Sequence, residues 1–373
     1  MHFSTLVAVN VPHVEEDVLE NFRANVALNQ LQQLKESGAD SVMIKLRIGQ
    51  IKSRISTFSR EVFSAVEEIM EPYCESTDDP DFLEFHDVTE DISEMYKNET
   101  YTVIKFPDGR MVFPYDAAFS QKYTLLDGKV FQRDFGQLKH KKRSKTAKKM
   151  RVIENYPFRK LYASVSEFAE KYTGYSFYEE MNAYGYYANP NAFWDWYVLG
   201  GRWPEPFLVK EDCMEYCISE DYDYEQSSAP EGYRWVCAAR KKDIQWSKML
   251  ELAQNDAKKK HSELKSWFER KSEPGILEKI TEEGIVSFGD VLYLKGESLQ
   301  DYLIRNHVDD SAKYPVSFYQ YLSEGSGYVW RNPDYKASCA DRAREEFEWD
   351  EDVASFIESL DGERVLVGVD CHI

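Results

Sequence analysis

The fold follows first from the two ends of the chain, which read MHFSTLVAVN at residues 1–10 and RVLVGVDCH at residues 364–372. Both stretches have apolar residues at consecutive positions, so both predict β-strands. The opening one is typical of a central strand that is buried on both faces. We therefore expect one sheet that joins the N-terminal and C-terminal strands.

A long helical pattern follows the first strand. Apolar residues recur at helical spacing over residues 15–36 and again over residues 39–73, with Ile51 in the second seam. The steps are close to a heptad, which predicts two antiparallel helices. Two interpretations stay open. The hairpin packs on the rest of the fold, or it protrudes as an arm through which Ile51 contacts a partner or a second copy of the chain.

The rest of the chain mixes strands, helices and loops without a regular βαβ period. This favours an α+β fold with a mixed or antiparallel sheet over a doubly wound α/β fold. The predicted organisation is an α+β core of residues 1–13 and 74–373, with the helical hairpin inserted at residues 14–73. Within the core we expect a helix from Tyr162 to Tyr172, capped by Ser164 or Ser166, and a longer one over about residues 242–271.

Composition excludes several classes of protein. The chain has 373 residues, 43% of them hydrophobic and 14% aromatic, and a formal net charge of −20. It can form a sizeable core, and it is neither a secreted mini-protein nor a globally basic nucleic-acid coat. No apolar run reaches the roughly 18 residues of a membrane helix, and the start of the chain lacks the pattern of a signal peptide. Six scattered cysteines fit a reducing, cytoplasmic location.

The densest chemical signal is the aromatic segment, NPNAFWDWYVLGGRW at residues 189–203. If it is extended, Trp194 and Trp196 share one face, and Asp195 and Tyr197 share the other. Gly200-Gly201 permits a tight turn. Two interpretations stay open: a core strand, or a pocket that stacks an aromatic ring and holds a phosphate. The candidate binding residues are Asn191, Trp194, Trp196, Tyr197, Arg202 and Trp203.

This segment resembles a motif of a family of uncharacterised proteins encoded by bacteriophages and other bacterial mobile elements. The opening Met1-His2-Phe3, the tract around Tyr73 with residues 82–87, residues 240–244 and the ending at residues 369–373 also look similar to that family. The resemblance implies a bacterial cytoplasm and a gene of a phage or mobile element. It implies no reaction and no cofactor, because the family has no assigned activity.

Three residues are candidates for catalysis. Asp370 and His372 point to the same side of the last strand, and Asp195 lies in the aromatic segment. If the first and last strands pair, His2 and His372 come near each other, and a general base or a metal site becomes conceivable. Other arrangements give weaker signals: Cys213 and Cys217 as zinc ligands, and the cluster Glu84, His86 and Asp87. We assign no metal and no cofactor.

Charge suggests partners. Residues 139–151 hold eight Lys or Arg, which could contact nucleic-acid phosphates, but the anionic chain as a whole does not favour nucleic acid as the partner. The acidic surface, represented by Glu345, Glu346 and Glu348, favours a binding protein that engages a host protein, plausibly as an inhibitor of a defence system. The alternatives are a nucleotide-binding hydrolase or transferase with the aromatic segment as its pocket, and an oligomeric scaffold built by the hairpin.

Overall fold

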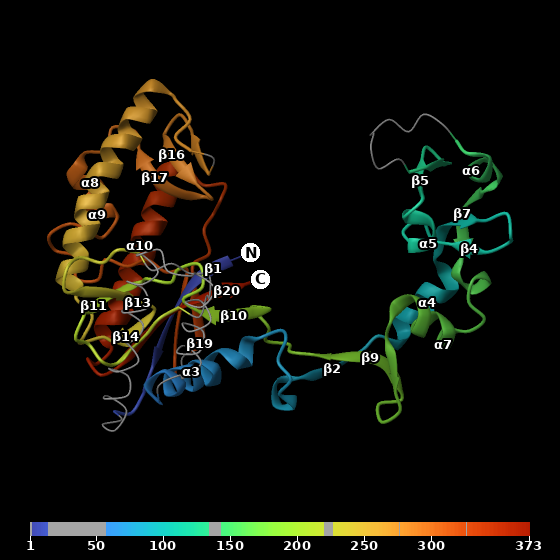
Figure 1. Ribbon diagram of the computed structural model, residues 1–373, viewed down its shortest axis with the longest axis horizontal. Helices are drawn as coiled ribbons and strands as arrows, with labels where there is room; N and C mark the ends of the chain where they lie inside the picture. The colour runs from blue at the N-terminus through green and yellow to red at the C-terminus, as the bar shows by residue number, and fades with distance from the viewer. Residues whose placement is uncertain (1, 14–56, 134–142, 220–226, 276, 326) are drawn as a thin grey trace, which may run out of the picture. The chain divides into compact units, whose positions relative to one another are not determined.

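The computed structural model describes residues 2–13, 57–133, 143–219, 227–275, 277–325 and 327–373. The chain divides into two compact units (Figure 1). The first unit comprises Met1–Thr77 and Asn191–Ile373, and the second unit comprises Asp78–Pro190. Helices and mixed sheets in one chain confirm the α+β class.

A seven-stranded sheet forms the centre of the first unit. Its order is β12 (Tyr216–Cys217), β14 (Ala238–Arg240), β20 (Val365–His372), β1 (His2–Val9), β18 (Gln320–Ser323) and β19 (Gly327–Trp330), with β10 (Trp196–Leu199) also paired to β20. β1 and β20 run antiparallel over their whole length, from His2 opposite His372 to Val9 opposite Val365. The predicted sheet that joins the N-terminal and C-terminal strands is therefore confirmed. It is mixed, because β1 pairs with β18 in parallel.

Both faces of this sheet are covered, which explains why its central strands lack a polar face. On one face, α3 (Thr57–Met70) packs its apolar stripe on Val7, Val9 and Val367. On the other face, α8 (Trp246–Arg270) and α10 (Cys339–Ser359) pack on Leu6, Ala8 and Leu366.

Most of the predicted helical hairpin, including Ile51, lies outside the described residues. Its last part is helical, as predicted, and corresponds to α3. The seam residues Phe58, Val62 and Val66 are buried against the central sheet. For α3, the structure therefore fits the interpretation of packing on the rest of the fold.

The remaining elements of the first unit lie around the helices. They are β11 (Phe207–Lys210) with β13 (Tyr233–Val236), the meander β15 (Glu278–Ile280), β16 (Gly284–Ser287) and β17 (Asp290–Leu294), the helix α9 (Leu299–Arg305), and the 3-10 turn η1 (Glu71–Tyr73). Among the helices of the described residues, none combines the length and the apolar composition that a membrane span requires.

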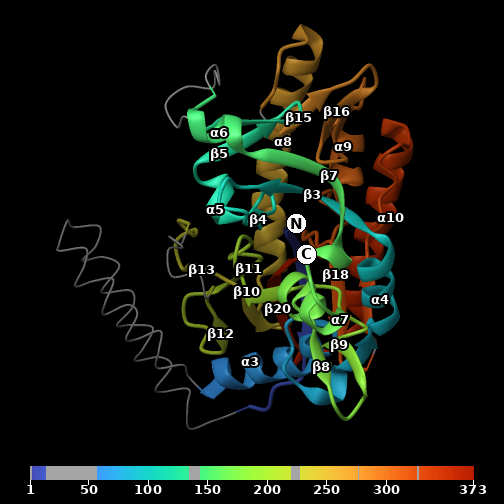
Figure 2. The same cartoon turned by 90° about the vertical axis from the view of Figure 1, so that its right-hand side faces the viewer.

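The second unit is built from small antiparallel sheets and short helices. Its strands are β2 (Glu84–Asp87), β9 (Ala183–Ala188) and β8 (Ser176–Tyr178), then β4 (Met111–Val112), β3 (Thr100–Lys105) and β7 (Arg151–Pro157), and the hairpin β5 (Tyr123–Leu126) with β6 (Lys129–Gln132). Its helices are α4 (Thr89–Asn98), α5 (Ala117–Ser120), α6 (Lys145–Lys149) and α7 (Val165–Phe168), with 3-10 turns η2 (Pro80–Phe82) and η3 (Phe158–Lys160). The π-helical turn η4 (Ala169–Thr173) continues α7, so the predicted helix of residues 162–172 begins at Val165. The strands β3 and β7 are visible side by side in Figure 2. Ser164 caps α7, as predicted, through a hydrogen bond from the Glu167 amide.

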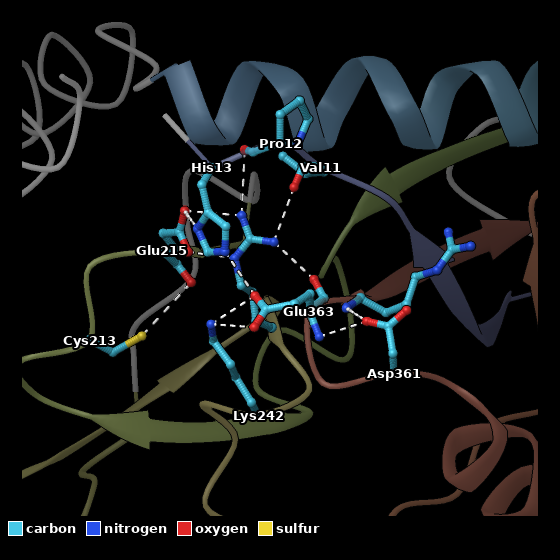
Figure 3. A network of polar contacts seen from close by, with 10 residues as sticks. Val11, Pro12, His13, Cys213, Glu215, Lys242, Asp361 and Glu363 are labelled. Carbon is cyan, nitrogen blue, oxygen red and sulfur yellow. Dashed lines mark hydrogen bonds and ion pairs between the residues drawn. The ribbon is translucent and has the colours of Figure 1, made fainter. Parts of the chain in front are cut away.

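The buried side chain of Arg240 forms hydrogen bonds with three separate segments of the first unit. The Arg240 guanidinium is 1% exposed and pairs with the Glu215 carboxylate through both Nε and Nη2. It also donates from Nη1 to the carbonyl oxygens of Val11, at 3.0 Å, and Glu363, at 2.9 Å. Figure 3 shows His13 beside this network, where its ring bonds both Glu215 and Glu363. Arg240 thus links the residues that follow β1 to the residues that precede β20.

Candidate functional site

Polar side chains interrupt the apolar alternation at one end of β1 and β20. Leu6 and Ala8 face the layer of α8 and α10, and steps of two residues place His2 and Ser4 on that same face. In the neighbouring strand, His372 stands opposite His2, and Asp370 stands opposite Ser4. The register therefore gathers two imidazoles and a carboxylate on one part of the sheet.

The two histidines form two His–Asp pairs. His2 Nδ1 lies 2.9 Å from Asp370 Oδ1, and His372 Nδ1 lies 2.8 Å from Asp195 Oδ2. The centroids of the two imidazole rings are 4.6 Å apart. A carboxylate only accepts hydrogen bonds, so Nδ1 of each histidine carries the proton of its His–Asp contact. In His2, Nε2 is then the ring nitrogen that can accept a second proton.

Trp196 completes a row of rings across three strands. It pairs with His372 in the register of β10 and β20, and its indole stacks on that imidazole at 5.3 Å and 9°. The indole also contacts His2 edge to face at 5.3 Å. The exposed fraction of Trp196 is 42%, so one side of this row is open to solvent.

Asp370 is held by the turn that follows β10. Its side chain is 2% exposed, and its Oδ2 accepts a hydrogen bond from the backbone N–H of Arg202 at 3.0 Å. Gly201, at φ +51°, passes so close that a Cβ there would lie 2.5 Å from the Cβ of Asp370. The predicted turn at Gly200-Gly201 is present, with a hydrogen bond from Trp203 N to Gly200 O. The glycine is required because only it lets the backbone approach this carboxylate.

The second carboxylate, Asp195, remains ionised. Partial desolvation raises the pKa of Asp195. The hydrogen bond from His372 and the charge of His372 lower this pKa by more, so the net shift is downward. The ionised carboxylate accepts a hydrogen bond from His372 Nδ1 and so orients the imidazole ring. The Asp195 backbone N–H also donates to the His372 carbonyl oxygen at 2.9 Å, which fixes the pair to the strand.

A cavity of about 550 Å³ adjoins these pairs through Ser4 and Arg202. Its wall is mostly apolar and aromatic, with a few charged groups. The lining residues are Ser4, Arg202, Trp203, Pro204, Glu205, Pro206, Trp235, Met249, Leu252, Ala253, Asp256, Pro315, Val316, Ser317 and Phe318. A volume of this size fits a small organic ligand such as a nucleotide.

The expected geometry of the two indoles is wrong. Trp194 is 1% exposed and belongs to the core under α3, next to Tyr73 and Tyr328, whereas Trp196 lies at the histidines. The chain bends at Asp195, and β10 begins only at Trp196. Trp194 instead makes a bridge to Cys74. The two-residue alternation fails because the segment is not one continuous strand.

The other candidate binding residues divide between core and surface. Tyr197 packs against the core under α3, and Asn191 is exposed near the start of the segment. Arg202 is exposed at the cavity, and within the described residues its guanidinium forms no ion pair. The contact of Arg202 with an acid is made by its backbone N–H, which donates to Asp370 Oδ2.

The remaining candidates do not join the site. Among the described residues, no group of three His, Cys, Asp or Glu is arranged to hold a metal ion. Cys213 donates to the Glu215 carbonyl oxygen, and Cys217 lies beside Ser59. His86 stacks on Tyr186 in the second unit.

Glu345, Glu346 and Glu348, which we expected at a partner-binding surface, do not lie together on one exposed surface. Glu348 is exposed, and Glu345 is half-buried. Glu346 faces inward, with a side chain that is 17% exposed and an oxygen 3.7 Å from Arg305 Nη1. Its inclusion in an exposed acidic patch is therefore wrong, because the helical period of α10 turns position 346 toward the buried cations.

Burial raises the pKa of Glu346 to about 7, although Arg331 and Arg305 oppose the shift. Its pKa in the folded state thus lies above the ordinary value of 4.5, and ionisation of Glu346 opposes folding as the pH rises toward 7. We expect Glu346→Gln to raise the melting temperature at pH 8, and the gain to shrink as the pH falls to 5. Thermal unfolding across pH measures this. The exposed control Glu348→Gln should show no such trend, and a loss of stability of Glu346→Gln at pH 8 would contradict the assignment.

Part of this site could be found from sequence and part could not. The approach of His2 to His372 follows from pairing the terminal strands, and that pairing is present. The partnership of His372 with Asp195 was missed, as were Ser4 and the cavity. No spacing in the sequence signals them, because Asp195 and His372 are 177 positions apart.

No protein-family model matches the chain, and no curated protein or solved structure matches it either. The resemblance to proteins of phages and mobile elements therefore stays a prediction.

Proposed function

We propose that the protein is an acid–base enzyme, a hydrolase or transferase, that acts on a phosphate ester of a nucleotide-sized ligand. The observation that carries this proposal is the pair of His–Asp contacts, whose imidazoles lie 4.6 Å apart. The cavity reaches these pairs at Asp370, through Arg202, whose backbone N–H binds that carboxylate, and through Ser4, which stands opposite it. Two imidazoles held by carboxylates can act as one proton acceptor and one proton donor within a single reaction.

The roles follow from the contacts. Asp370 fixes the proton of His2 on Nδ1, so Nε2 is oriented to accept the proton of an attacking water or hydroxyl. Asp195 orients the ring of His372, which serves as the acid and gives a proton to the leaving oxygen. The new P–O bond forms as the old one breaks, and the two protons moved leave the net charge of the pair unchanged.

Ligand recognition is assigned to the cavity. Arg202 is the cation at its edge, and a guanidinium binds two phosphate oxygens at once. Trp203, Trp235 and Phe318 supply aromatic surface for a base. The carboxylates of Glu205 and Asp256 can accept hydrogen bonds from exocyclic amino groups of a base.

Single substitutions of the two histidines test the proposal. We expect His2→Gln and His372→Gln each to lower turnover of bis(p-nitrophenyl) phosphate, or of a nucleotide found in a phosphoesterase screen, by about 10²–10⁴-fold. The wild-type rate should depend on pH as a bell, because one imidazole must be neutral and the other protonated. His86→Gln, an exposed histidine of β2, is the matched control and should keep full turnover.

Turnover that survives in both variants, or a complete absence of turnover across the screen, would contradict the proposal.

The second candidate would then be the acidic protein that binds a host factor in a bacterial cytoplasm. Its specific support is the outer side of α10, which exposes Glu348, Glu351, Asp352 and Glu358.

A further inference from the structure

Charge is strongly segregated within the second unit. The basic segment, defined as residues 100–133 and 143–160, contains twelve Lys and Arg and four Asp and Glu, a net charge of +8 in a chain of −20. It comprises β3, β4, α5, the hairpin of β5 and β6, α6 and β7. The net negative charge of the whole chain therefore does not extend to this part of the fold, which can attract the phosphates of a nucleic acid.

Most cations of the basic segment lie on its surface, outside any ion pair of the described residues. Nine of them are exposed and form no ion pair within the described residues: Lys105, Lys122, Lys129, Lys145, Lys148, Lys149, Arg151, Arg159 and Lys160. Arg110, by contrast, pairs with Asp108 at 2.8 Å. Nine unneutralised cations leave the segment with a positive potential.

One pair of these cations opposes folding. Lys105, at the end of β3, stands directly opposite Arg151, at the start of β7. Like charges in register across an antiparallel pair destabilise a sheet. Arg151 follows the last turn of α6, which adds Lys148 and Lys149 nearby. A structural role does not account for this repulsion, whereas a polyanionic ligand does.

Exposed aromatic rings accompany the cations. Tyr101 lies on β3, and its ring contacts that of Tyr115 at 6.0 Å and 81°. Both side chains are exposed. Tyr101 and Lys105 lie on the same strand, four residues apart. A binding surface for single strands combines exposed rings, on which bases stack, with cations, which bind the phosphates.

We propose that the basic segment binds single-stranded nucleic acid through Lys105 and Arg151, with Tyr101 and Tyr115 as stacking residues. The proposal stands apart from the acid–base chemistry of the first unit and fails or holds independently of it. The contacts are to the phosphate backbone and to base faces, so little sequence specificity is expected.

Binding of the full-length protein to a fluorescent single-stranded 20-mer tests the proposal, measured by anisotropy over a salt series. Lys105→Gln with Arg151→Gln should weaken binding and reduce the slope of log K against log salt by about 1.4, since each phosphate contact on a single strand contributes about 0.7. The melting temperature of this double variant should equal or exceed that of the wild type, because the repulsion is removed. A structural role predicts the opposite change in melting temperature.

The matched control is Lys258→Gln with Lys259→Gln, two exposed lysines of α8, which changes the charge equally and should leave binding unchanged. Tyr115→Ala should weaken binding about fivefold or more without changing the salt slope. Three outcomes overturn the proposal: no binding of the 20-mer at 50 mM salt, equal losses in the test and control variants, or binding of heparin or anionic vesicles that competes fully while Tyr115→Ala has no effect.

Discussion

Replacing Trp194 by alanine is expected to lower the free energy of unfolding by roughly 3–5 kcal/mol. The indole is 1% exposed and contacts Tyr73, Phe193 and Tyr328 in the core between α3 and the central sheet. Removing it leaves a cavity that these rings cannot fill without moving. Chemical denaturation followed by circular dichroism measures the change.

Trp194→Phe is the matched control. The indole Nε1 is buried and has no hydrogen-bond partner among the described residues, so phenylalanine keeps an aromatic ring and removes an unsatisfied donor. We expect this variant to lose far less stability than Trp194→Ala. Equal losses in the two variants, or no loss in either, would show that Trp194 does not fill the core.

The second large effect is expected for Arg240→Met, at roughly 3–5 kcal/mol. The substitution keeps most of the aliphatic volume but removes the partner of Glu215 and the donors to two carbonyl oxygens (Figure 3). Hydrogen bonding to Arg240 and its charge outweigh desolvation and lower the pKa of Glu215. That stabilisation is present above the ordinary pKa of a glutamate and is lost as the pH falls, so the difference between wild type and variant should shrink in acid.

Lys242→Met provides the comparison for Arg240. Lys242 pairs with Glu363 in the same network, but its side chain is 42% exposed. An exposed ion pair contributes about 0–1 kcal/mol, so this variant should stay close to the wild type. If Arg240→Met were no more destabilising than Lys242→Met, the network would not fix the two terminal strands.

Local pattern was sufficient for the elements whose environment is simple. The consecutive apolar residues at both ends predict buried strands, and these are β1 and β20. The predicted helix over about residues 242–271 corresponds to α8, which ends at Arg270 and is followed by Lys271 in a left-handed conformation. The cap at Ser164 is likewise local, because its partner is three residues away. Each of these features depends on neighbours in sequence, which a pattern records.

The unit formed by residues 78–190 is not predicted by the sequence pattern. The helical pattern predicts an inserted hairpin at residues 14–73, whereas the structure separates a unit at Asp78–Pro190. Its boundary is marked by no linker rich in glycine or serine. What distinguishes this unit is its own pair of apolar clusters, around Phe158 and around Ile104, and such clustering is a property of contacts in space.

Local pattern is sufficient to predict the α+β class, the two terminal strands at the centre of the sheet and the approach of His2 to His372. The rest of the site depends on contacts between segments that are far apart in the sequence. Because the chain bends at Asp195, Trp194 lies in the core and Trp196 lies beside the histidines. The turn at Gly200-Gly201 brings the backbone N–H of Arg202 within hydrogen-bond distance of Asp370. The physical reason is that strand alternation fixes faces only within a continuous strand, whereas the His–Asp pairs arise where three separate segments of the chain meet.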